Sequence, residues 1–469
     1  MENVNNNEST VVIELPAKNR NCIMIGCICL MLSIACFGLS LAVIQGPVLE
    51  EMDAMSYFST LTIFASLGLA ILTPIGGKLG DLFGRRNVVI IAGSVAAICG
   101  IGMGLVKTVV PFMILRLILG AAQGAFTAAP YILIGEIYEQ KDVPKRLGIL
   151  SSSIAIGGFA GSIIAGILTD LGYLKLGIVF PVIPLLIGVL LIAFNLPNKK
   201  REKKAVIDYK GVVILALFLT ALLLSLNYGP KIGWGNFKII IGFIAALILG
   251  VLLVKVERVA SEPVVPMHLF ANKRYRSLII VGVIAYFYQE AMNMYAPLSV
   301  QKVLGQSTTV SGALQFPRTI LIMILPIFVG TWITKKRKNS RKAMIMATGL
   351  VAAAFLVMGL VTNDKTPVVI YFIALALTGV AESFRAVSIT PAAQASLDPS
   401  ELGIGTSLLT FMNSLSPLLA AAICGIVFDV NKDNIQTGIN GVFLLTAVVA
   451  IIGLLIVIFC IKDKEEKEN

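Results

Sequence analysis

Fourteen long apolar stretches divide this 469-residue chain, and they restrict its fold more than any other feature. Each is long enough to cross a hydrocarbon core of about 30 Å as a helix. Lipid offers free backbone groups no hydrogen-bond partner, so we expect every stretch to be helical. The sequence therefore predicts an all-α polytopic membrane protein with 14 transmembrane helices. The predicted spans are about 22–44, 57–76, 88–106, 109–135, 147–168, 176–196, 211–228, 237–255, 277–298, 310–333, 343–361, 367–390, 402–428 and 441–461.

The basic residues determine the predicted orientation of these helices. Most of the 38 Lys and Arg lie in alternate gaps and in the two tails. Cationic loops cross membranes poorly, so this asymmetry predicts a multi-pass protein of the cell (cytoplasmic) membrane with both termini in the cytoplasm. A net charge of +12 would suit nucleic acid, but its placement on one side of a membrane indicates topology and attraction to anionic lipid. We expect the lipid bilayer as a partner, and no nucleic acid.

The gaps divide the chain into a six-helix part, a helix pair and a second six-helix part. The 6+2+6 plan predicts two bundles with an inserted pair between them, whereas a channel or a membrane-embedded enzyme would be the alternative architecture. The predicted segments are a cytoplasmic tail at 1–21, a six-helix bundle at 22–196, a basic cytoplasmic loop at 197–210, an inserted pair at 211–256, a cytoplasmic linker at 257–276, a second six-helix bundle at 277–461 and a tail at 462–469.

The gap after the second stretch carries a dense set of glycines and charges. It reads Gly-Lys-Leu-Gly-Asp-Leu-Phe-Gly-Arg-Arg, and its glycines permit a tight cytoplasmic turn. An Asp here can accept bonds from a helix amino terminus or pair with Arg, and the two Arg can hold carboxylates. We call this predicted arrangement the clasp; the alternative is an ordinary basic turn. Its residues are Gly77, Asp81, Gly84, Arg85, Arg86 and Glu136, the last at the inner end of the fourth span.

This segment closely resembles the signature loop of the major facilitator superfamily, which runs Gly-x-Leu-Ala-Asp-Arg-x-Gly-Arg-Arg. The matching positions include Asp81 and Arg85, whereas Gly80 and Leu82 depart from the pattern. The resemblance implies two six-helix bundles with a binding site near the midplane between them. It also implies that the clasp breaks and reforms as the bundles rock, which would bias one conformation.

The second half resembles the 14-helix drug:proton antiporter branch of this superfamily. That resemblance implies proton-coupled export of small amphipathic compounds or drugs by alternating access. The branch usually has an acidic residue in its first helix, where this chain has Gly38, so a proton relay would need other groups. The similar stretches are 208–211, 233–234, 262–263, 266–270 and 300–305.

The fourth and fifth spans match two further patterns of the superfamily. The fourth contains Arg116, in a motif like Arg-x-x-Gln-Gly with Leu119 in place of Gln. A buried Arg costs at least about 2.5–3.5 kcal/mol at midmembrane, so the resemblance implies proton transfer or binding of an anionic group; the alternative is an Arg that extends outward to water. The fifth span has the glycine spacing of the antiporter motif, without its Pro, and predicts a smooth packing face or a generic small-residue stripe. These glycines are Gly148, Gly157, Gly161 and Gly166.

Four ionisable residues lie inside the spans of the second half. Glu290 is the first candidate for carrying a proton, because a carboxyl buried in the membrane can bind one at physiological pH. Its alternative is a structural ion pair with Arg318. Glu382 and Arg385 lie three apart and can pair on one helix face, in a structural or gating role.

The intramembrane charges also bear on the substrate. Three Arg against two deep Glu slightly favour an anionic or zwitterionic substrate over a lipophilic cation. We therefore keep an organic-anion transporter, for example of bile-acid-like compounds or carboxylates, as the alternative function, and a non-transporting membrane sensor as another. Candidates for lining the cavity are Phe126, Tyr131, Tyr288, Met292 and Phe411.

The sequence predicts neither an enzyme nor a resident cofactor. No nucleophile–base pair, phosphate-binding loop or metal cluster is evident, and His268 is the only histidine. We expect no cofactor and no metal, and a monomer whose partners are a small-molecule substrate and protons.

Overall fold

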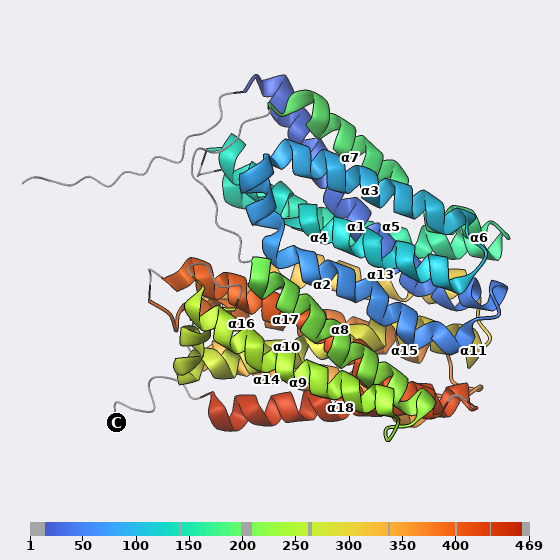
Figure 1. The fold of residues 1–469 in the computed structure, drawn as a ribbon. Coiled ribbons are helices and arrows are strands. Elements are labelled where there is room, and N and C mark those ends of the chain that lie inside the picture. Colours follow the sequence, from blue (N-terminus) through green and yellow to red (C-terminus); the bar gives the residue numbers. More distant parts are fainter. Residues whose placement is uncertain are drawn as a thin grey trace, which may run out of the picture.

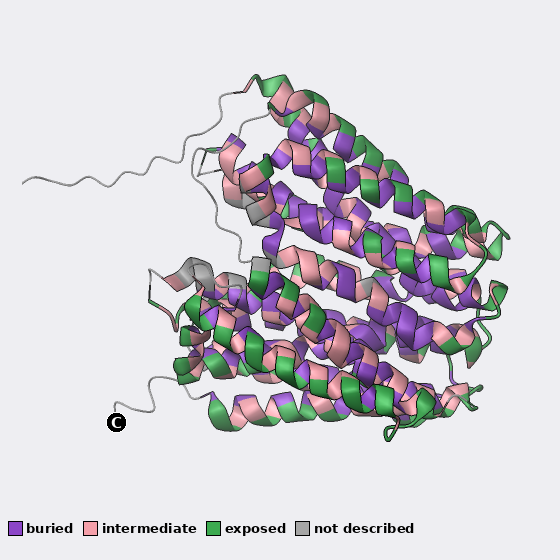
Figure 2. Cartoon of the chain, in the orientation of Figure 1, coloured by how far each residue is buried: buried purple, intermediate pink, exposed green. Residues whose placement is uncertain are grey.

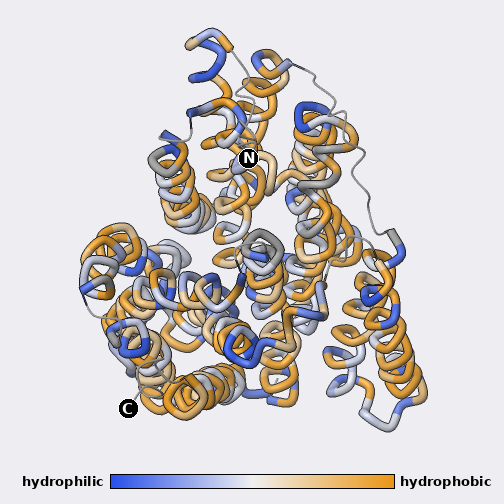
Figure 3. The backbone as a smooth tube through the Cα atoms, turned by 90° about the vertical axis from the view of Figure 1, so that its left-hand side faces the viewer, coloured by the Kyte–Doolittle hydropathy of each residue, from blue (hydrophilic) through white to orange (hydrophobic). Residues whose placement is uncertain are grey.

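The computed structural model describes residues 15–139, 142–197, 209–260, 265–335, 338–398, 401–431 and 433–461. Within those ranges the chain is helical, without strands, and 14 helical segments are long and apolar enough to span a membrane. The predicted fold class is therefore confirmed. Orange, hydrophobic residues run along the helices and blue, hydrophilic ones gather near their ends (Figure 3).

The first bundle occupies the upper part of Figure 1. Within it α2 packs on α4, α1 on α5 and α7, and α3 on α4 and α7. Its elements are α1 (Ala17–Glu51), η1 (Met55–Tyr57), α2 (Phe58–Phe83), α3 (Arg85–Leu105), α4 (Val109–Ile137), α5 (Val143–Asp170), α6 (Leu174–Val179) and α7 (Val182–Asn195).

The second bundle occupies the lower part of Figure 1, where α14 packs on α15 and α18, α13 on α15, and α10 on α17. The π-helical segment Ala291–Tyr295, labelled η3, joins α10 to α11. The remaining elements are η2 (Met267–Ala271), α10 (Lys273–Glu290), α11 (Ala296–Lys302), α12 (Thr308–Ala313), α13 (Gln315–Lys335), α14 (Lys338–Val361), α15 (Val369–Ala386), α16 (Ile389–Gln394), α17 (Leu402–Val430) and α18 (Ile435–Cys460).

The helix pair α8 (Tyr209–Ile232) and α9 (Phe237–Val259) lies between the two bundles in sequence and beside them in space. Helix α8 packs on α2 of the first bundle and on α17 of the second, while α9 packs mainly on α8. The outward faces of the pair carry many exposed residues, shown green in Figure 2. An apolar exposed face of this kind suits lipid.

Several described spans depart from the predicted continuous helices. Four are interrupted: at 180–181, at the π-helical segment 291–295, at Leu314 and at 387–388. Pro181 explains the first break, because proline has no N–H to continue the helix. The first span is also longer than predicted, since α1 continues past Pro47 to Glu51.

The direct contacts between the bundles join α5 to α12 and α13, α2 to α17, and α1 to the segment from η3 to α12. Because the number of spans is even, α1 begins and α18 ends on the same side of the molecule, on the left in Figure 1. We call that side the terminal end and the other side the sealed end.

Candidate functional site

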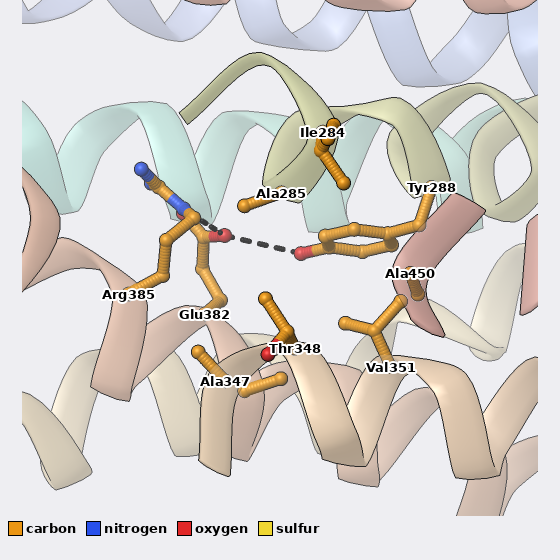
Figure 4. A pocket seen from close by; sticks show the side chains of 10 residues that line it. Ile284, Ala285, Tyr288, Ala347, Thr348, Val351, Glu382, Arg385 and Ala450 are labelled. Atoms are coloured by element: carbon orange, nitrogen blue, oxygen red, sulfur yellow. Dashed lines mark hydrogen bonds and ion pairs between the residues drawn. The ribbon is translucent and has the colours of Figure 1, made fainter. Parts of the chain in front are cut away.

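A buried network of charged and aromatic side chains lies inside the second bundle (Figure 4). The Nε atom of Arg385 donates to a Glu382 carboxylate oxygen at 2.8 Å, and its Nη2 pairs with the other oxygen. The hydroxyl of Tyr288 donates to Glu382 at 3.1 Å, and Nη2 of Arg318 lies 3.5 Å from that hydroxyl. The predicted pairing of Glu382 with Arg385 is therefore present, and the network couples α10, α13 and α15.

Two features of this network were not predicted from the sequence. The guanidinium carbon of Arg385 lies 3.9 Å from the centre of the Tyr286 ring, a cation–π contact. A cavity of about 10 Å³ lies between Tyr288, Thr348 and Glu382, and it is large enough for about one water. Most of the residues that line this cavity are apolar, but Thr348 and Glu382 bring polar groups to it.

Glu290 lies apart from this network, at the end of α10. Only 4% of it is exposed, and within the described part of the chain no hydrogen bond or ion pair joins it to another residue. The alternative of a pair with Arg318 is wrong in this structure, because Arg318 lies against Tyr288 instead. The π-helical segment begins at the next residue, and such segments often mark functional sites.

Arg116 is the corresponding isolated charge of the first bundle. It is only 6% exposed, so the alternative in which it extends to water is not seen here. Among the described residues it has no hydrogen-bond or ion-pair partner. A buried cation without a partner is costly, so this position suits an anion or a proton-transfer step.

The described residues show one ion pair of the predicted clasp and a different partner for Arg86. Arg85 pairs with Glu136 at 3.2 Å, as predicted, but Nε of Arg86 donates to the carbonyl oxygen of Ala193 at 2.9 Å. Arg86 cannot reach the same carboxylate because it points toward α7. The side chain of Asp81 lies outside the described part of the structure.

The predicted tight turn of the clasp segment does not lie at Gly77 or Gly80. Helix α2 continues through Gly77 and Gly80 to Phe83, because its backbone hydrogen bonds are not interrupted there. Only Gly84 turns the chain, with a φ of 83° that favours glycine.

Two glycines of the α5 stripe bring that helix against α1 within the first bundle. A Cβ added to Gly157 would lie 2.5 Å from the carbonyl oxygen of Leu32, and one added to Gly161 would lie 2.7 Å from Cα of Cys36. The absence of side chains therefore permits direct backbone contact.

A third glycine of the stripe lies where the two bundles are in contact. A Cβ on Gly166 would lie 2.7 Å from the carbonyl oxygen of Thr308 in α12. Nearby, the Ser162 hydroxyl donates to the carbonyl oxygen of Gly312 at 3.0 Å. Gly148 has no atom within 4 Å of its added Cβ, so close packing does not require glycine there. The four glycines of the predicted stripe thus have three kinds of surroundings: α1, α12 and open space.

Polar contacts between α2, α8 and α17 stabilise one side of the sealed end, and they were not predicted from the sequence. Asp429 of α17 accepts a hydrogen bond from Ser59 of α2 at 2.9 Å and lies 3.3 Å from Nζ of Lys231 in α8. Lys231 also donates to Thr60 at 3.0 Å, and Thr60 donates to Asn227 at 2.6 Å. We call Ser59, Lys231 and Asp429 the latch. It ties the inserted pair to both bundles.

On its other side, the sealed end is held by α5, α11 and α12. The carboxylate of Asp170 accepts from the backbone N–H groups of Thr308 and Thr309 at 2.9 and 2.8 Å. The amide of Gln301 donates to the carbonyl oxygen of Val43 at 2.9 Å, which joins α11 to α1.

An aromatic group completes the sealed end. The ring of Tyr295 lies 5.8 Å from Phe58 and 5.4 Å from Phe428, so one ring from each of η3, α2 and α17 meets at this end. Lys302 forms an ion pair with Glu50 nearby. These contacts lie far apart in the sequence, and no single segment carried a signal for them.

We expect Lys231→Ala to weaken the seal. The change removes one ionic partner of Asp429, whose side chain is 9% exposed, and should shift the conformational equilibrium by about 1–2 kcal/mol, or about 5- to 30-fold. Spin labels at Tyr173 and Gln306 would report the change as a longer distance between the bundles. Lys365→Ala is the control, since Lys365 is exposed. Equal distances in Lys231→Ala and wild type would contradict the role of the latch.

Four of the five predicted cavity residues are buried in this conformation. Phe126, Met292 and Phe411 pack within the bundles, whereas Tyr288 lines the small cavity of the buried network. Large apolar side chains pack between helices whenever a neighbour is within reach. Tyr131 differs, with 36% of its surface exposed.

Two packed bundles of helices that are long enough to span a membrane, with charged groups buried inside them, are typical of membrane transporters. The Major Facilitator Superfamily model matches residues 23–421 and 340–469. The chain belongs to this superfamily, and it is a multi-pass secondary transporter for small molecules.

Several members of the superfamily are similar to this protein over most of its length. The chain is 26% identical over 425 residues to "Multidrug transporter protein MdtP" of Bacillus subtilis (strain 168), which covers 89% of this chain and 77% of that protein. It is 25% identical to "Multidrug resistance protein 3" of the same organism, over 82% and 75% of the two chains. It spans only 52% of "Uncharacterized MFS-type transporter Rv1877" of Mycobacterium tuberculosis (strain ATCC 25618 / H37Rv), at 27% identity over 77% of this chain.

Solved structures share the fold. A POT family transporter in complex with a thioalcohol-conjugated peptide superposes with a TM-score of 0.71 at 15% identity, over 94% of this chain and 95% of that one. A point mutant of the nucleoside transporter NupG gives 0.66 at 15% identity, over 95% and 100%.

Proposed function

We propose that this protein exports small amphipathic organic compounds, including drugs, in exchange for protons by alternating access between its two bundles. The similarity to multidrug transporters over more than four fifths of the chain carries the proposal. The bundles at 22–196 and 277–461 move as units, and the protein works as a monomer in the cell membrane.

In this proposal the terminal end faces the cytoplasm. The basic residues of the gaps at that end support the orientation through the positive-inside rule. The sealed end then faces outward, and the structure corresponds to the inward-facing state. Transport requires the latch and the α5–α12 contact to open while the clasp end closes.

Glu290 carries the proton in this mechanism. A buried carboxylate without a partner is too costly to leave charged, so the group binds a proton in this conformation. Among the described residues, Tyr295 of η3 and Cys424 of α17 lie close enough to interact with it, and neither supplies a positive charge. In this exchange the group takes up its proton from the outside when the sealed end is open, and releases it to the cytoplasm after the protein has returned to the inward-facing state.

We expect Glu290→Gln to abolish transport driven by a pH gradient while leaving substrate binding intact. The glutamine keeps the shape but cannot exchange a proton, so pH-driven flux should fall at least about tenfold. Flux into proteoliposomes measures this. Glu290→Asp is the matched control, because it retains a titratable carboxyl and should restore part of the coupling. Normal coupling in Glu290→Gln would show that Glu290 is structural.

The test of the whole proposal is flux in proteoliposomes with an imposed pH gradient. A panel of lipophilic cations and organic anions serves as substrate. Proton-driven movement of amphipathic compounds supports the proposal, whereas flux that ignores the gradient overturns proton coupling. Ligand binding with no flux would instead indicate a sensor.

A second candidate, transport of organic anions, is favoured by the isolated charge of Arg116. Its buried guanidinium has no partner among the described residues and would attract a carboxylate or sulfonate. Anion-selective flux that Arg116→Gln reduces at least about tenfold would favour this candidate. Unchanged anion flux in that variant would exclude the role for Arg116.

A further inference from the structure

An apolar groove runs along the inserted helix pair on the outside of the molecule. Its volume is about 640 Å³. Phe218 and Leu222 of α8 form one wall, and Phe243, Leu247 and Val251 of α9 form the other. The groove shares no lining residue with the cavity of the buried network or with the latch, and the transport mechanism proposed above does not involve it.

Two cations lie at one end of this groove. Lys255 and Arg258 both line it, and they lie three residues apart on α9, so they share a helix face. Both are exposed, and within the described part of the chain neither has a hydrogen-bond or ion-pair partner. The acid between them in sequence, Glu257, is buried and accepts a hydrogen bond from the backbone N–H of Val265 at 2.9 Å. Its charge is therefore directed away from the groove.

The position of the cations matches the depth of lipid headgroups. Lys255 and Arg258 lie in the last two turns of α9, at the terminal end of a helix that is long enough to cross the membrane. Only 17% of the apolar stretch of α9 is buried within the protein, so most of this helix is free to contact lipid. A groove with apolar walls in the acyl region and two cations in the headgroup region complements a molecule with an apolar chain and an anionic headgroup.

We infer that this groove binds one anionic phospholipid. An acyl chain lies against Phe218, Leu247 and Val251, and the phosphate lies between Lys255 and Arg258. Arg can hold two phosphate oxygens at once, and Lys adds a point charge. Because α8 also carries Lys231 of the latch, the bound lipid contacts the same helix pair that joins the two bundles.

Native mass spectrometry of the full-length protein in non-ionic detergent tests the inference. Wild-type protein should retain phosphatidylglycerol in preference to phosphatidylcholine. Each cation contributes about fivefold to affinity, so Lys255→Gln/Arg258→Gln should bind phosphatidylglycerol about 25-fold more weakly. Unchanged affinity in the double variant would overturn the inference. Each single variant should lose about fivefold, which keeps the test available if the double variant fails to fold.

A matched control separates this site from general electrostatic attraction. Lys273 and Arg276 are also three residues apart and exposed, and they lie in the first turn of α10 at the same end of the molecule. Lys273→Gln/Arg276→Gln should leave phosphatidylglycerol binding unchanged. An equal loss in this control would show that the lipid senses only net charge, and would overturn a specific site.

Competition with inorganic phosphate distinguishes a phospholipid from a free phosphate ion as the ligand. The groove predicts that the acyl chain supplies much of the affinity, so millimolar phosphate should not displace phosphatidylglycerol. Displacement by phosphate alone would show that the groove contributes nothing and that the site is not a lipid site. None of these measurements depends on transport, so their outcome is independent of the proposed function.

Discussion

Glu382→Gln is expected to destabilise the protein by about 3–5 kcal/mol and to abolish transport. Glu382 is the anion of the buried network, where it accepts from Arg385 and Tyr288, and Arg385 is only 7% exposed. Removing the negative charge leaves the Arg385 cation buried without an ionic partner, and that loss is large inside a protein. Thermal unfolding in detergent and flux in proteoliposomes measure the two effects.

The double variant Glu382→Gln/Arg385→Gln distinguishes a structural pair from a working one. It removes both charges, so no unpaired charge remains and most of the lost stability should return. Transport should stay at least about tenfold below wild type if the network couples α10, α13 and α15 during the cycle. A double variant that transports normally would mark the pair as structural only. A stable Glu382→Gln variant would show that the network tolerates an unpaired Arg.

Gly166→Leu is expected to prevent the sealed end from closing. Any Cβ at this position lies 2.7 Å from the backbone oxygen of Thr308, and a backbone atom cannot move aside as a side-chain end can. Overpacking costs about 1–3 kcal/mol, which would shift the equilibrium away from this conformation by about 5- to 150-fold. Transport should fall by at least about tenfold, and labels at Tyr173 and Gln306 should move apart.

Two other glycines of the same helix provide matched controls. Gly148→Leu enters open space and should leave both transport and the label distance unchanged. Gly161→Leu meets Cα of Cys36 within the first bundle, so it should lower the thermal stability. Gly166→Leu should leave the thermal stability of the first bundle unchanged, because its steric clash is with a residue of the second bundle. Equal changes in transport, label distance and thermal stability in all three variants would contradict the assignment of different surroundings to these glycines.

The sequence by itself determined the fold class and the superfamily. Apolar length and the need to satisfy backbone groups in lipid are local properties, so the 14 spans and their helical nature could be predicted without knowing how they pack. The clasp segment with Asp81 and Arg85 indicated the superfamily that the family model then matched. The pairing of Glu382 with Arg385 was also predictable, because three residues on one helix place both on the same face.

The tertiary structure alone decided which distant residues meet. Helix rotation directs Arg86 to the carbonyl oxygen of Ala193 and places Glu290 away from Arg318, although the sequence allowed other partners for both. The latch between Lys231 and Asp429 joins residues from different helices, each of which looks like an ordinary charge at a helix end. Charge, length and periodicity are properties of one segment, whereas a contact depends on the rotation and tilt of two helices, which only their packing fixes.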